Sequence, residues 1–224
     1  MCGRFTLKTP PQVVAELFGL DEVPAWEPRY NIAPTQPVAA VRAARDGGQR
    51  ELVFLHWGLI PSWADDWRIG NRMINARSET VAEKPAFRRA FRQRRCLVPA
   101  DGFFEWQRQG TKKQPYYIHR RDGRPLAIAG LWEHWAGAGS GPVESCTLLT
   151  TAANATLRPL HDRMPVLLEP AQFDTWLDPE QHSVESLVAL LAPADDAVLE
   201  AYAVSTVVNS PRNDSPACIE PKPA

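Results

Sequence analysis

Hydrophobic and polar residues alternate in short runs along most of this chain, and glycine or proline residues separate the runs. Alternation over a few residues is typical of half-buried β-strands, because successive side chains of a strand point to opposite faces. The opening residues 3–7 have the same character. The pattern predicts strands over residues 38–44, 51–57, 96–99, 102–107, 116–120, 126–135, 146–151 and 201–208, with turns at 46–48, 110–113, 122–123 and 137–141.

A helical period of apolar residues is confined to a few segments. The clearest one follows Pro10 and Pro11 and ends before Gly19, which is the usual start and end of a helix. Many short strands with few helices predict a curved, mainly antiparallel sheet or a partial barrel with peripheral helices. The remaining expected helices cover 84–93, 170–177 and 184–191, whereas 24–37 and the tail 211–224 are expected to be irregular.

Composition limits the classes of protein to consider. With 224 residues and 44% hydrophobic content the chain can bury a core, and we expect one domain over residues 1–224. No apolar run reaches the length of about 18 residues that spans a membrane, and no secretory signal precedes the first strand. The cysteines are widely spaced, which predicts neither a zinc site nor a disulfide framework and favours a cytoplasmic protein. Cys96 and Cys146 lie in apolar runs and are interpreted as buried, inert thiols.

Charge is distributed unevenly although the formal net charge is only −1. Nine basic and two acidic residues lie in 68–95, whereas 165–211 contains eight acidic residues and no Lys or Arg. Such asymmetry is a candidate footprint for a polyanion. The alternative is a solvated basic helix face, to which we assign Arg88, Arg89, Arg92 and Arg95.

Cys2 carries the most distinctive chemistry, because it directly follows the initiator Met1. Removal of Met1 would place a free α-amine and a thiol on one residue. Such a 1,2-aminothiol reacts with aldehydes: the amine forms a Schiff base and the thiol then closes a thiazolidine ring. The two groups ordinarily titrate at about pH 8 and about pH 8.5, so both are partly nucleophilic near neutrality. The alternative is that Cys2 belongs to a disordered tail.

Two further polar clusters interrupt apolar surroundings. In 75–80, Asn75 could bind a hydroxyl or carbonyl, Arg77 could clamp a phosphate and Ser78 could add a hydrogen bond. The alternative is a capping segment before the next helix. In 102–106, strand alternation would place Glu105 on one face with Phe103, where burial would raise its pKa and suit proton transfer. The alternative is an exposed Glu on an edge strand.

A third cluster contains His161, the best candidate for a general acid or base among the five histidines, and Arg163, a second anion clamp. A purely structural histidine is the alternative. The tryptophan-rich loop is a fourth candidate: Trp57 is assigned to the core, and Trp63 and Trp67 to base stacking, which contributes about 1–3 kcal/mol per base.

Together these segments resemble one family, the SOS-response-associated peptidase (SRAP) family, over about residues 2–221. The resemblance implies an α+β fold, a bifurcated antiparallel sheet curled into a pseudo-barrel. The matching motifs, in order, are Cys2-Gly3-Arg4-Phe5, Arg29-Tyr30-Asn31-Ile32-Ala33-Pro34, Trp57-Gly58-Leu59-Ile60-Pro61, Asn75-Ala76-Arg77-Ser78-Glu79-Thr80, Gly102-Phe103-Phe104-Glu105-Trp106 and His161-Asp162-Arg163-Met164-Pro165.

The resemblance implies recognition of abasic sites in single-stranded DNA and at its junctions with duplex, through a covalent crosslink that shields the lesion. Cys2 would be the nucleophile, Asn75 would position it, Glu105 would shuttle protons, and His161 would assist sugar-ring opening and reversal. It further implies a monomer without metal or cofactor, associated with the nucleoid when bound to DNA. The residues implied to contact DNA are Arg4, Pro34, Trp63, Trp67, Arg77, Ser78, Thr151 and Arg163.

Three other activities stay open at this point. The family name preserves a thiol peptidase of the N-terminal-nucleophile type that removes its own first residue. A noncovalent single-strand binding module would leave Cys2 incidental. A DNA lyase activity through the Schiff base could coexist with crosslinking. One departure from the family pattern is Phe104, which stands where many relatives have a hydroxyl-bearing aromatic residue.

Overall fold

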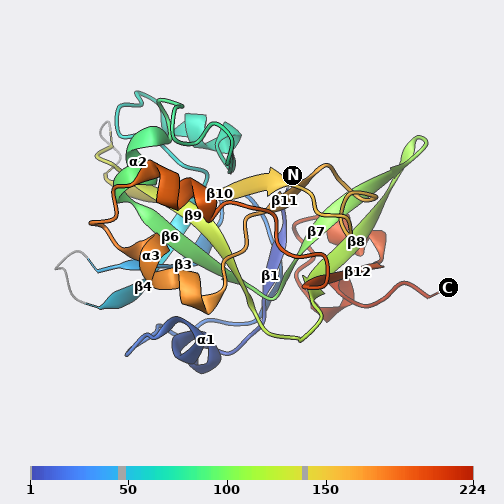
Figure 1. The fold of residues 1–224 in the computed structure, drawn as a ribbon. Coiled ribbons are helices and arrows are strands. Elements are labelled where there is room, and N and C mark those ends of the chain that lie inside the picture. Colours follow the sequence, from blue (N-terminus) through green and yellow to red (C-terminus); the bar gives the residue numbers. More distant parts are fainter. Residues whose placement is uncertain (1, 45–48, 138–140, 224) are drawn as a thin grey trace.

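The computed structural model describes residues 2–44, 49–137 and 141–223 (Figure 1). Its strands lie in two sheets whose order differs from the order along the chain. The strands are β1 (Phe5–Leu7), β2 (Arg29–Ile32), β3 (Pro37–Ala43), β4 (Arg50–Trp57), β5 (Asn75–Arg77), β6 (Arg95–Ala100), β7 (Gly102–Gln109), β8 (Lys112–Arg120), β9 (Leu126–Trp135), β10 (Val143–Ala152), β11 (Arg163–Pro165) and β12 (Leu199–Ala203).

One sheet has the order β12-β8-β7-β1-β2, and all of its pairings are antiparallel. The other runs β11-β10-β4-β3-β6-β9, and β9 pairs again with β10, so five of its strands close into a barrel. Within this second sheet β10 is parallel to β4 and to the short β5, whereas the other pairings are antiparallel. This mainly antiparallel α+β arrangement confirms the predicted fold class.

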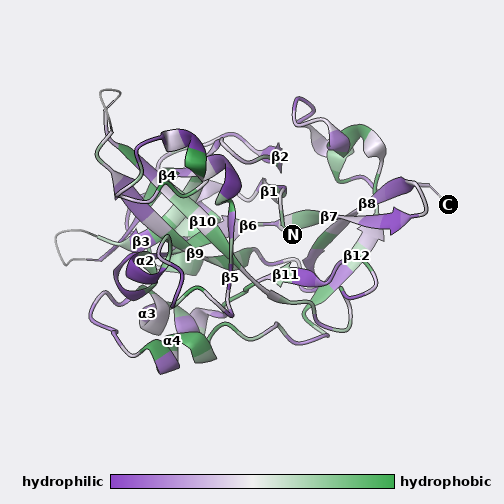
Figure 2. Ribbon diagram, turned by 90° about the horizontal axis from the view of Figure 1, so that it is seen from above, coloured by the Kyte–Doolittle hydropathy of each residue, from purple (hydrophilic) through white to green (hydrophobic). Residues whose placement is uncertain are grey.

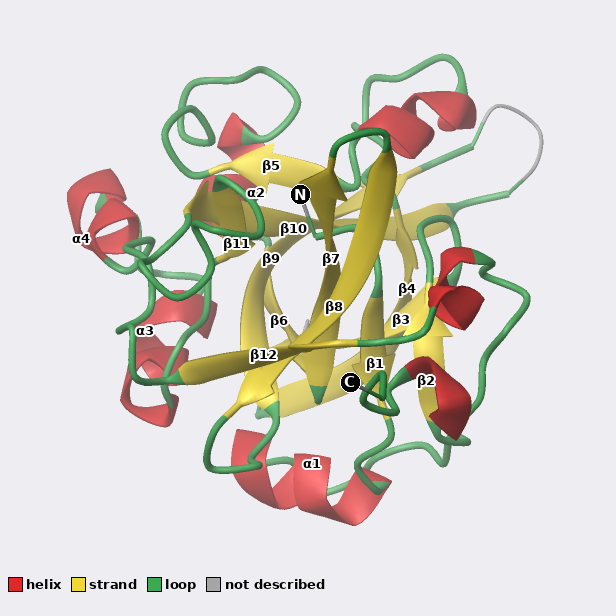
Figure 3. Cartoon of the chain, turned by 90° about the vertical axis from the view of Figure 1, so that its right-hand side faces the viewer, coloured by secondary structure: helices red, strands yellow, loops and turns green. Residues whose placement is uncertain are grey.

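Helices lie around the outside of the strands (Figure 3). In α1 (Pro11–Phe18), Pro11 occupies the first turn and Gly19 ends the helix with φ 64°, a left-handed conformation that favours glycine. None of the helices within the described ranges is long and apolar enough to cross a membrane. The other helical segments are α2 (Arg88–Gln93), α3 (Phe173–Leu177), α4 (Val184–Ala189) and the 3-10 turns η1 (Trp67–Arg72), η2 (Pro170–Gln172), η3 (Thr206–Asn209) and η4 (Pro216–Cys218).

The main core fills the barrel and continues between the two sheets. Hydrophobic colour runs along β6, β9 and β10 in Figure 2, whereas the outer loops are mostly hydrophilic. Phe5 of β1 packs on Trp57 of β4 with ring centroids 5.1 Å apart, and both side chains are buried. Burial of one such side chain contributes about 1.5–3 kcal/mol, so this contact helps to hold the sheets together.

The sequence pattern was wrong at four places. Residues 24–37 contain β2, because its backbone pairs with β1. The expected strand 201–208 is β12 followed by η3, where Ser205 caps the turn by accepting from the Val207 N–H. The helix expected over 84–93 is confined to α2. The tail expected to be irregular from residue 211 contains η4 and buries Cys218. The expected turn at 46–48, and residues 138–140 of the expected turn at 137–141, lie outside the described residues.

Arg95 is a further correction, since it does not lie on a solvated helix face. It begins β6, is buried, and its guanidinium donates to the backbone oxygens of Trp176 at 2.5 Å and Phe91 at 2.8 Å. Burial lowers its pKa to about 10. The arginine therefore ties α2 and α3 to the barrel, and three more carbonyls accept from it: those of Arg92, Asp178 and Gln181.

Candidate active site at the amino terminus

Cys2 is buried rather than part of a loose tail. It precedes β1, which lies between β7 and β2, and the Phe104 N–H donates to the Arg4 oxygen at 3.0 Å, so pairing with β7 continues towards Cys2. From the other sheet, the Asn75 side-chain N–H donates to the Cys2 oxygen at 2.8 Å. Figures 1 and 2 place this amino-terminal segment between the two sheets.

Glu105 lies on β7, an inner strand between β1 and β8, and only 4% of it is exposed. The alternative of an exposed Glu on an edge strand is therefore wrong. Burial raises the pKa of Glu105, while the nearby positive charge of His161 acts in the opposite direction. A carboxyl group with a raised pKa can take up and release protons closer to neutral pH.

The Cys2 thiol lies in an environment that keeps it protonated. Burial raises its pKa strongly, and the negative charge of Glu105 raises it further. Its Sγ lies 3.9 Å from the Arg4 oxygen, the carbonyl to which it can donate. The ordinary thiol value that the sequence suggests does not apply here, so the sulfur needs a base before it can act as a nucleophile.

Asn75 lies on β5, which pairs in parallel with β10 and aligns Asn75 with Leu148. The strand rules out the interpretation of Asn75 as part of a helix cap. Its side-chain Oδ1 is buried and has no hydrogen-bond partner among the described residues. An unsatisfied buried acceptor beside Cys2 could bind an amine or a sugar hydroxyl.

His161 lies in the turn before β11, on the same side of the fold as Glu105, whose charge state it influences. Its Nδ1 accepts from the Arg163 N–H at 3.0 Å and lies 2.9 Å from Asp162 Oδ1. The two contacts require opposite protonation of Nδ1, because the N–H needs an acceptor and the carboxylate needs a donor.

The four basic or hydroxyl side chains expected to hold phosphates are not equally available. Arg77 is exposed and has no ion-pair partner among the described residues, and the Ser78 N–H donates to the Thr150 oxygen at 2.8 Å. Arg163 is paired with Glu79 at 2.5 Å. Arg4 donates to Asn31 Oδ1 at 2.8 Å and to the carbonyls of Val208 and Asn209 at 2.9 Å and 3.3 Å.

Beside Arg4 lies a surface pocket of about 460 Å³. Trp106 was not among the candidate site residues, because strand alternation places it only on the face opposite Glu105. Its indole Nε1 donates to Asn209 Oδ1 at 2.7 Å, and the Arg4 guanidinium lies 5.9 Å from its ring centroid. Neither Asn209 nor Lys113, which lies in an expected turn, was a candidate site residue. The pocket is lined by Gly3, Arg4, Pro34, Trp106, Lys113 and Asn209.

The burial of the three tryptophans agrees with the expectation that Trp57 lies in the core and that Trp63 and Trp67 are available at the surface. Trp57 is buried, whereas 59% of Trp63 and 45% of Trp67 are exposed. Trp67 makes an edge contact with His56 at 6.5 Å between ring centroids. Thr151, on β10, is buried opposite Met164.

Comparison with known proteins identifies the family. The model of the family described as "SOS response associated peptidase (SRAP)" matches residues 1–211. The chain belongs to the SRAP family. It is 44% identical over 224 residues to the abasic site processing protein YoqW of Bacillus subtilis (strain 168), covering 98% of this chain and 99% of that protein.

Two further comparisons also cover nearly the whole chain. The abasic site processing protein HMCES of Xenopus tropicalis is 31% identical over 262 residues, covering 98% of this chain and 78% of that protein. An X-ray crystal structure of a Bacteroides thetaiotaomicron protein has a TM-score of 0.89 at 26% identity, covering 99% of this chain and all of that one.

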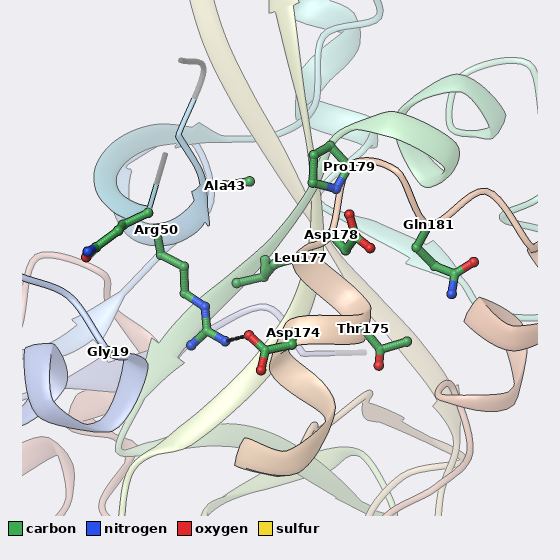
Figure 4. A pocket seen from close by; sticks show the side chains of 10 residues that line it. Gly19, Ala43, Arg50, Asp174, Thr175, Leu177, Asp178, Pro179 and Gln181 are labelled. Atoms are coloured by element: carbon green, nitrogen blue, oxygen red, sulfur yellow. Dashed lines mark hydrogen bonds and ion pairs between the residues drawn. The ribbon is translucent and has the colours of Figure 1, made fainter. Parts of the chain in front are cut away.

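A separate cavity of this SRAP chain, of about 740 Å³, contains none of the expected site residues. It lies between α1, the start of β4 and α3 (Figure 4). Arg50 donates there to Asp174 Oδ1 at 2.5 Å and to the Phe18 oxygen at 2.7 Å. Arg50 and Asp174 form an ion pair there, and no cysteine, histidine or lysine lies among the described residues that line the cavity. Likewise, no cluster of potential ligands for a metal ion occurs among the described residues.

The other thiols fit the interpretation of inert cysteines. Burial raises the pKa of Cys96 to about 12 and that of Cys146 well above its usual range. A nearby carboxylate, that of Glu105, acts on the Cys2 thiol but on neither of these two thiols.

Proposed function

We propose that this protein recognises abasic sites in single-stranded DNA and at single-strand/duplex junctions, and that it binds them covalently through Cys2. The observation that carries the proposal is that Cys2, which becomes a 1,2-aminothiol once Met1 is removed, is buried, accepts a hydrogen bond from Asn75 and lies close enough to Glu105 to be influenced by its charge. The names of the relatives, abasic site processing proteins, support the same substrate. Crosslinking would shield the lesion until it is repaired.

The reaction begins when Met1 has been removed. The α-amine of Cys2 attacks the C1′ aldehyde of the ring-opened deoxyribose, and loss of one water gives a Schiff base. The thiol sulfur then adds to C1′ while its proton is transferred to the nitrogen, which closes the thiazolidine. The product has one C–N and one C–S bond to C1′, and one water is released overall.

The electrostatics favour amine attack before thiol attack. The thiol is neutral because burial and the charge of Glu105 raise its pKa. Once an iminium forms beside it, Glu105 can accept the thiol proton and pass it to the nitrogen. We assign Glu105 this shuttle, Asn75 the positioning of Cys2 and the sugar, and His161 the proton transfers of sugar-ring opening and of reversal.

The DNA contacts are part of the same proposal. Arg77 and Ser78, together with Arg163 and Arg4, would hold the phosphates next to the lesion, and Thr151 would lie near the reacting carbon. Pro34 would contact a base at the pocket beside Arg4. Trp63 or Trp67 would stack on a flanking base, which their exposure supports.

Self-removal of Met1 is a second activity, which the position of Cys2 favours although burial keeps its thiol protonated. The Cys2 thiol lies directly after the Met1–Cys2 peptide bond, with Glu105 available as a base. Cleavage of the DNA strand would require only that the Schiff base undergo elimination before the thiol closes the ring.

The test is a denaturing gel with a single-stranded oligonucleotide that carries one abasic site. Mass spectrometry first establishes that Met1 is absent. Wild type is expected to give a slow-migrating band without borohydride. Cys2→Ala keeps the α-amine but lacks the thiol, so it should give a band only after borohydride reduction. Cys218→Ala, which changes a thiol elsewhere, should behave as wild type, and an oligonucleotide without the lesion should give no band.

Absence of a band from wild-type protein lacking Met1 would refute the covalent mechanism. In that case the autopeptidase would be favoured if the purified chain releases its first residue and the Cys2→Ala variant does not.

A further inference from the structure

Arg163 is already occupied by a carboxylate. Its Nη1 and Nη2 donate to Glu79 Oε1 and Oε2 at 2.5 Å and 2.9 Å, a bidentate pair. Nη2 also donates to the Thr150 oxygen at 2.6 Å. The Arg163 side chain is 13% exposed, whereas that of Glu79 is 50% exposed.

Few of the N–H groups of Arg163 remain available to a ligand. A guanidinium has five N–H groups. Three of those of Arg163 are used by Glu79 and Thr150, and its Nε is buried without a partner among the described residues. One N–H on Nη1 is left, so a phosphate cannot form the two parallel hydrogen bonds that arginine prefers while Glu79 stays in place.

Glu79 is well placed to leave. It lies in the turns after β5, outside the paired strands, and its neighbour Ser78 is anchored to Thr150 by a backbone hydrogen bond of 2.8 Å. The turn can therefore release the Glu79 side chain without unpairing the sheet. The hydrogen bonds from Arg163, and to a smaller extent the positive charge of the exposed Arg77, lower the pKa of the Glu79 carboxyl, so the group is an anion at neutral pH.

We propose that Glu79 is an internal competitor for DNA: it occupies the phosphate-binding face of Arg163 in the free protein and is displaced by a backbone phosphate. The inference rests on the proposed DNA-binding function. Its consequence is weak binding to intact DNA, so that prolonged binding depends on the covalent bond formed at an abasic site.

The test uses Cys2→Ala protein and an undamaged single-stranded oligonucleotide, with affinity measured by fluorescence polarisation. Glu79→Gln keeps an oxygen acceptor for Arg163 but removes the charge. It is expected to tighten binding about 3- to 10-fold, the range for one charge removed at roughly 6 Å from a phosphate in a mostly aqueous medium. Glu83→Gln makes the same change of charge on an exposed residue four positions further on and should have a clearly smaller effect.

A background without the arginine isolates the pair. In Arg163→Gln protein, the added Glu79→Gln change should tighten binding clearly less than it does when Arg163 is present, because only the direct repulsion between Glu79 and the phosphate remains. The proposal is overturned if Glu79→Gln weakens binding or leaves it unchanged, which would make Glu79 a support that positions Arg163. It is also overturned if Glu83→Gln tightens binding equally.

A second measurement separates this proposal from the DNA-binding function. Sodium pyrophosphate is titrated while the Arg163 Nε–Hε signal is followed by NMR, with Arg163→Lys to assign it. Glu79→Gln should lower the pyrophosphate concentration needed to shift the signal. If the wild type binds no DNA but shows this shift, the DNA function fails while the competition stands. If Glu79→Gln leaves the titration unchanged, the competition fails.

Discussion

Replacement of Glu105 by Gln separates its chemical role from its structural one. Gln has nearly the same volume but cannot carry a proton between the thiol and the nitrogen. General acid–base catalysis contributes about 10²- to 10⁴-fold, so we expect crosslinking to slow by that factor, or about 3–5 kcal/mol of barrier. Removal of the Glu105 charge also removes one cause of the raised pKa of the Cys2 thiol. The pKa of the thiol stays raised, because burial is the larger cause and the substitution leaves it unchanged.

The same substitution should not destabilise the fold. The folded-state pKa of Glu105 is raised, mainly by burial, so its ionised form is disfavoured in the native state. Between the unfolded value of about 4.3 and the raised folded value, the native state binds more protons than the unfolded state, and stability falls as pH rises. Above that window wild type carries a buried charge, so Glu105→Gln should be at least as stable as wild type at pH 7.

The assay is single-turnover crosslinking to an abasic oligonucleotide, quantified on denaturing gels from pH 5 to 9, with thermal unfolding measured in parallel. The wild-type rate should fall as pH falls through the raised pKa of Glu105, because the base form is lost, and Glu105→Gln should lack this inflection. Glu83→Gln, on the surface, serves as the control. A Glu105→Gln protein that crosslinks at the wild-type rate, or keeps the inflection, would refute the assignment of the shuttle.

Three further predictions concern other parts of the site and fold. Asn75→Ala removes one hydrogen bond to Cys2 and should slow crosslinking about 5- to 10-fold while noncovalent DNA affinity changes little; equal losses in both would contradict a positioning role. Arg77→Gln should reduce the slope of log affinity against log salt concentration by about 1, and an unchanged slope would exclude a phosphate contact. Arg95→Ala leaves several buried carbonyls without donors and should lower the free energy of unfolding in urea by about 3–5 kcal/mol; a loss as small as that of exposed Arg89→Ala would contradict its structural role.

Local patterns along the chain were sufficient for much of the fold. Alternation predicted the strands of the barrel, and the Pro11 and Gly19 signals predicted α1, because backbone conformation and the choice of buried face depend on neighbours within a few residues. The pattern failed at β2 because that strand depends on a distant partner, β1. It failed in 201–208 for a local reason, since Ser205 caps η3 and the alternation of residues does not reveal such a cap.

The candidate site shows the same division. The order of motifs selected Cys2, Asn75, Glu105 and His161, but the ordinary pKa of a free thiol does not anticipate how burial and Glu105 alter Cys2. That shift depends on two sheets closing around the residue, which no short window of sequence contains.

The sequence by itself therefore determined the strand pattern and the chemical identity of the nucleophile with its candidate partners. Tertiary structure alone decided which charges are free: Arg95 is buried among carbonyls, and Arg163 is paired with Glu79, 84 residues away in the chain. The physical reason is that hydrophobic periodicity is a local property, whereas hydrogen-bond pairing and desolvation depend on which distant groups the folded chain brings into contact.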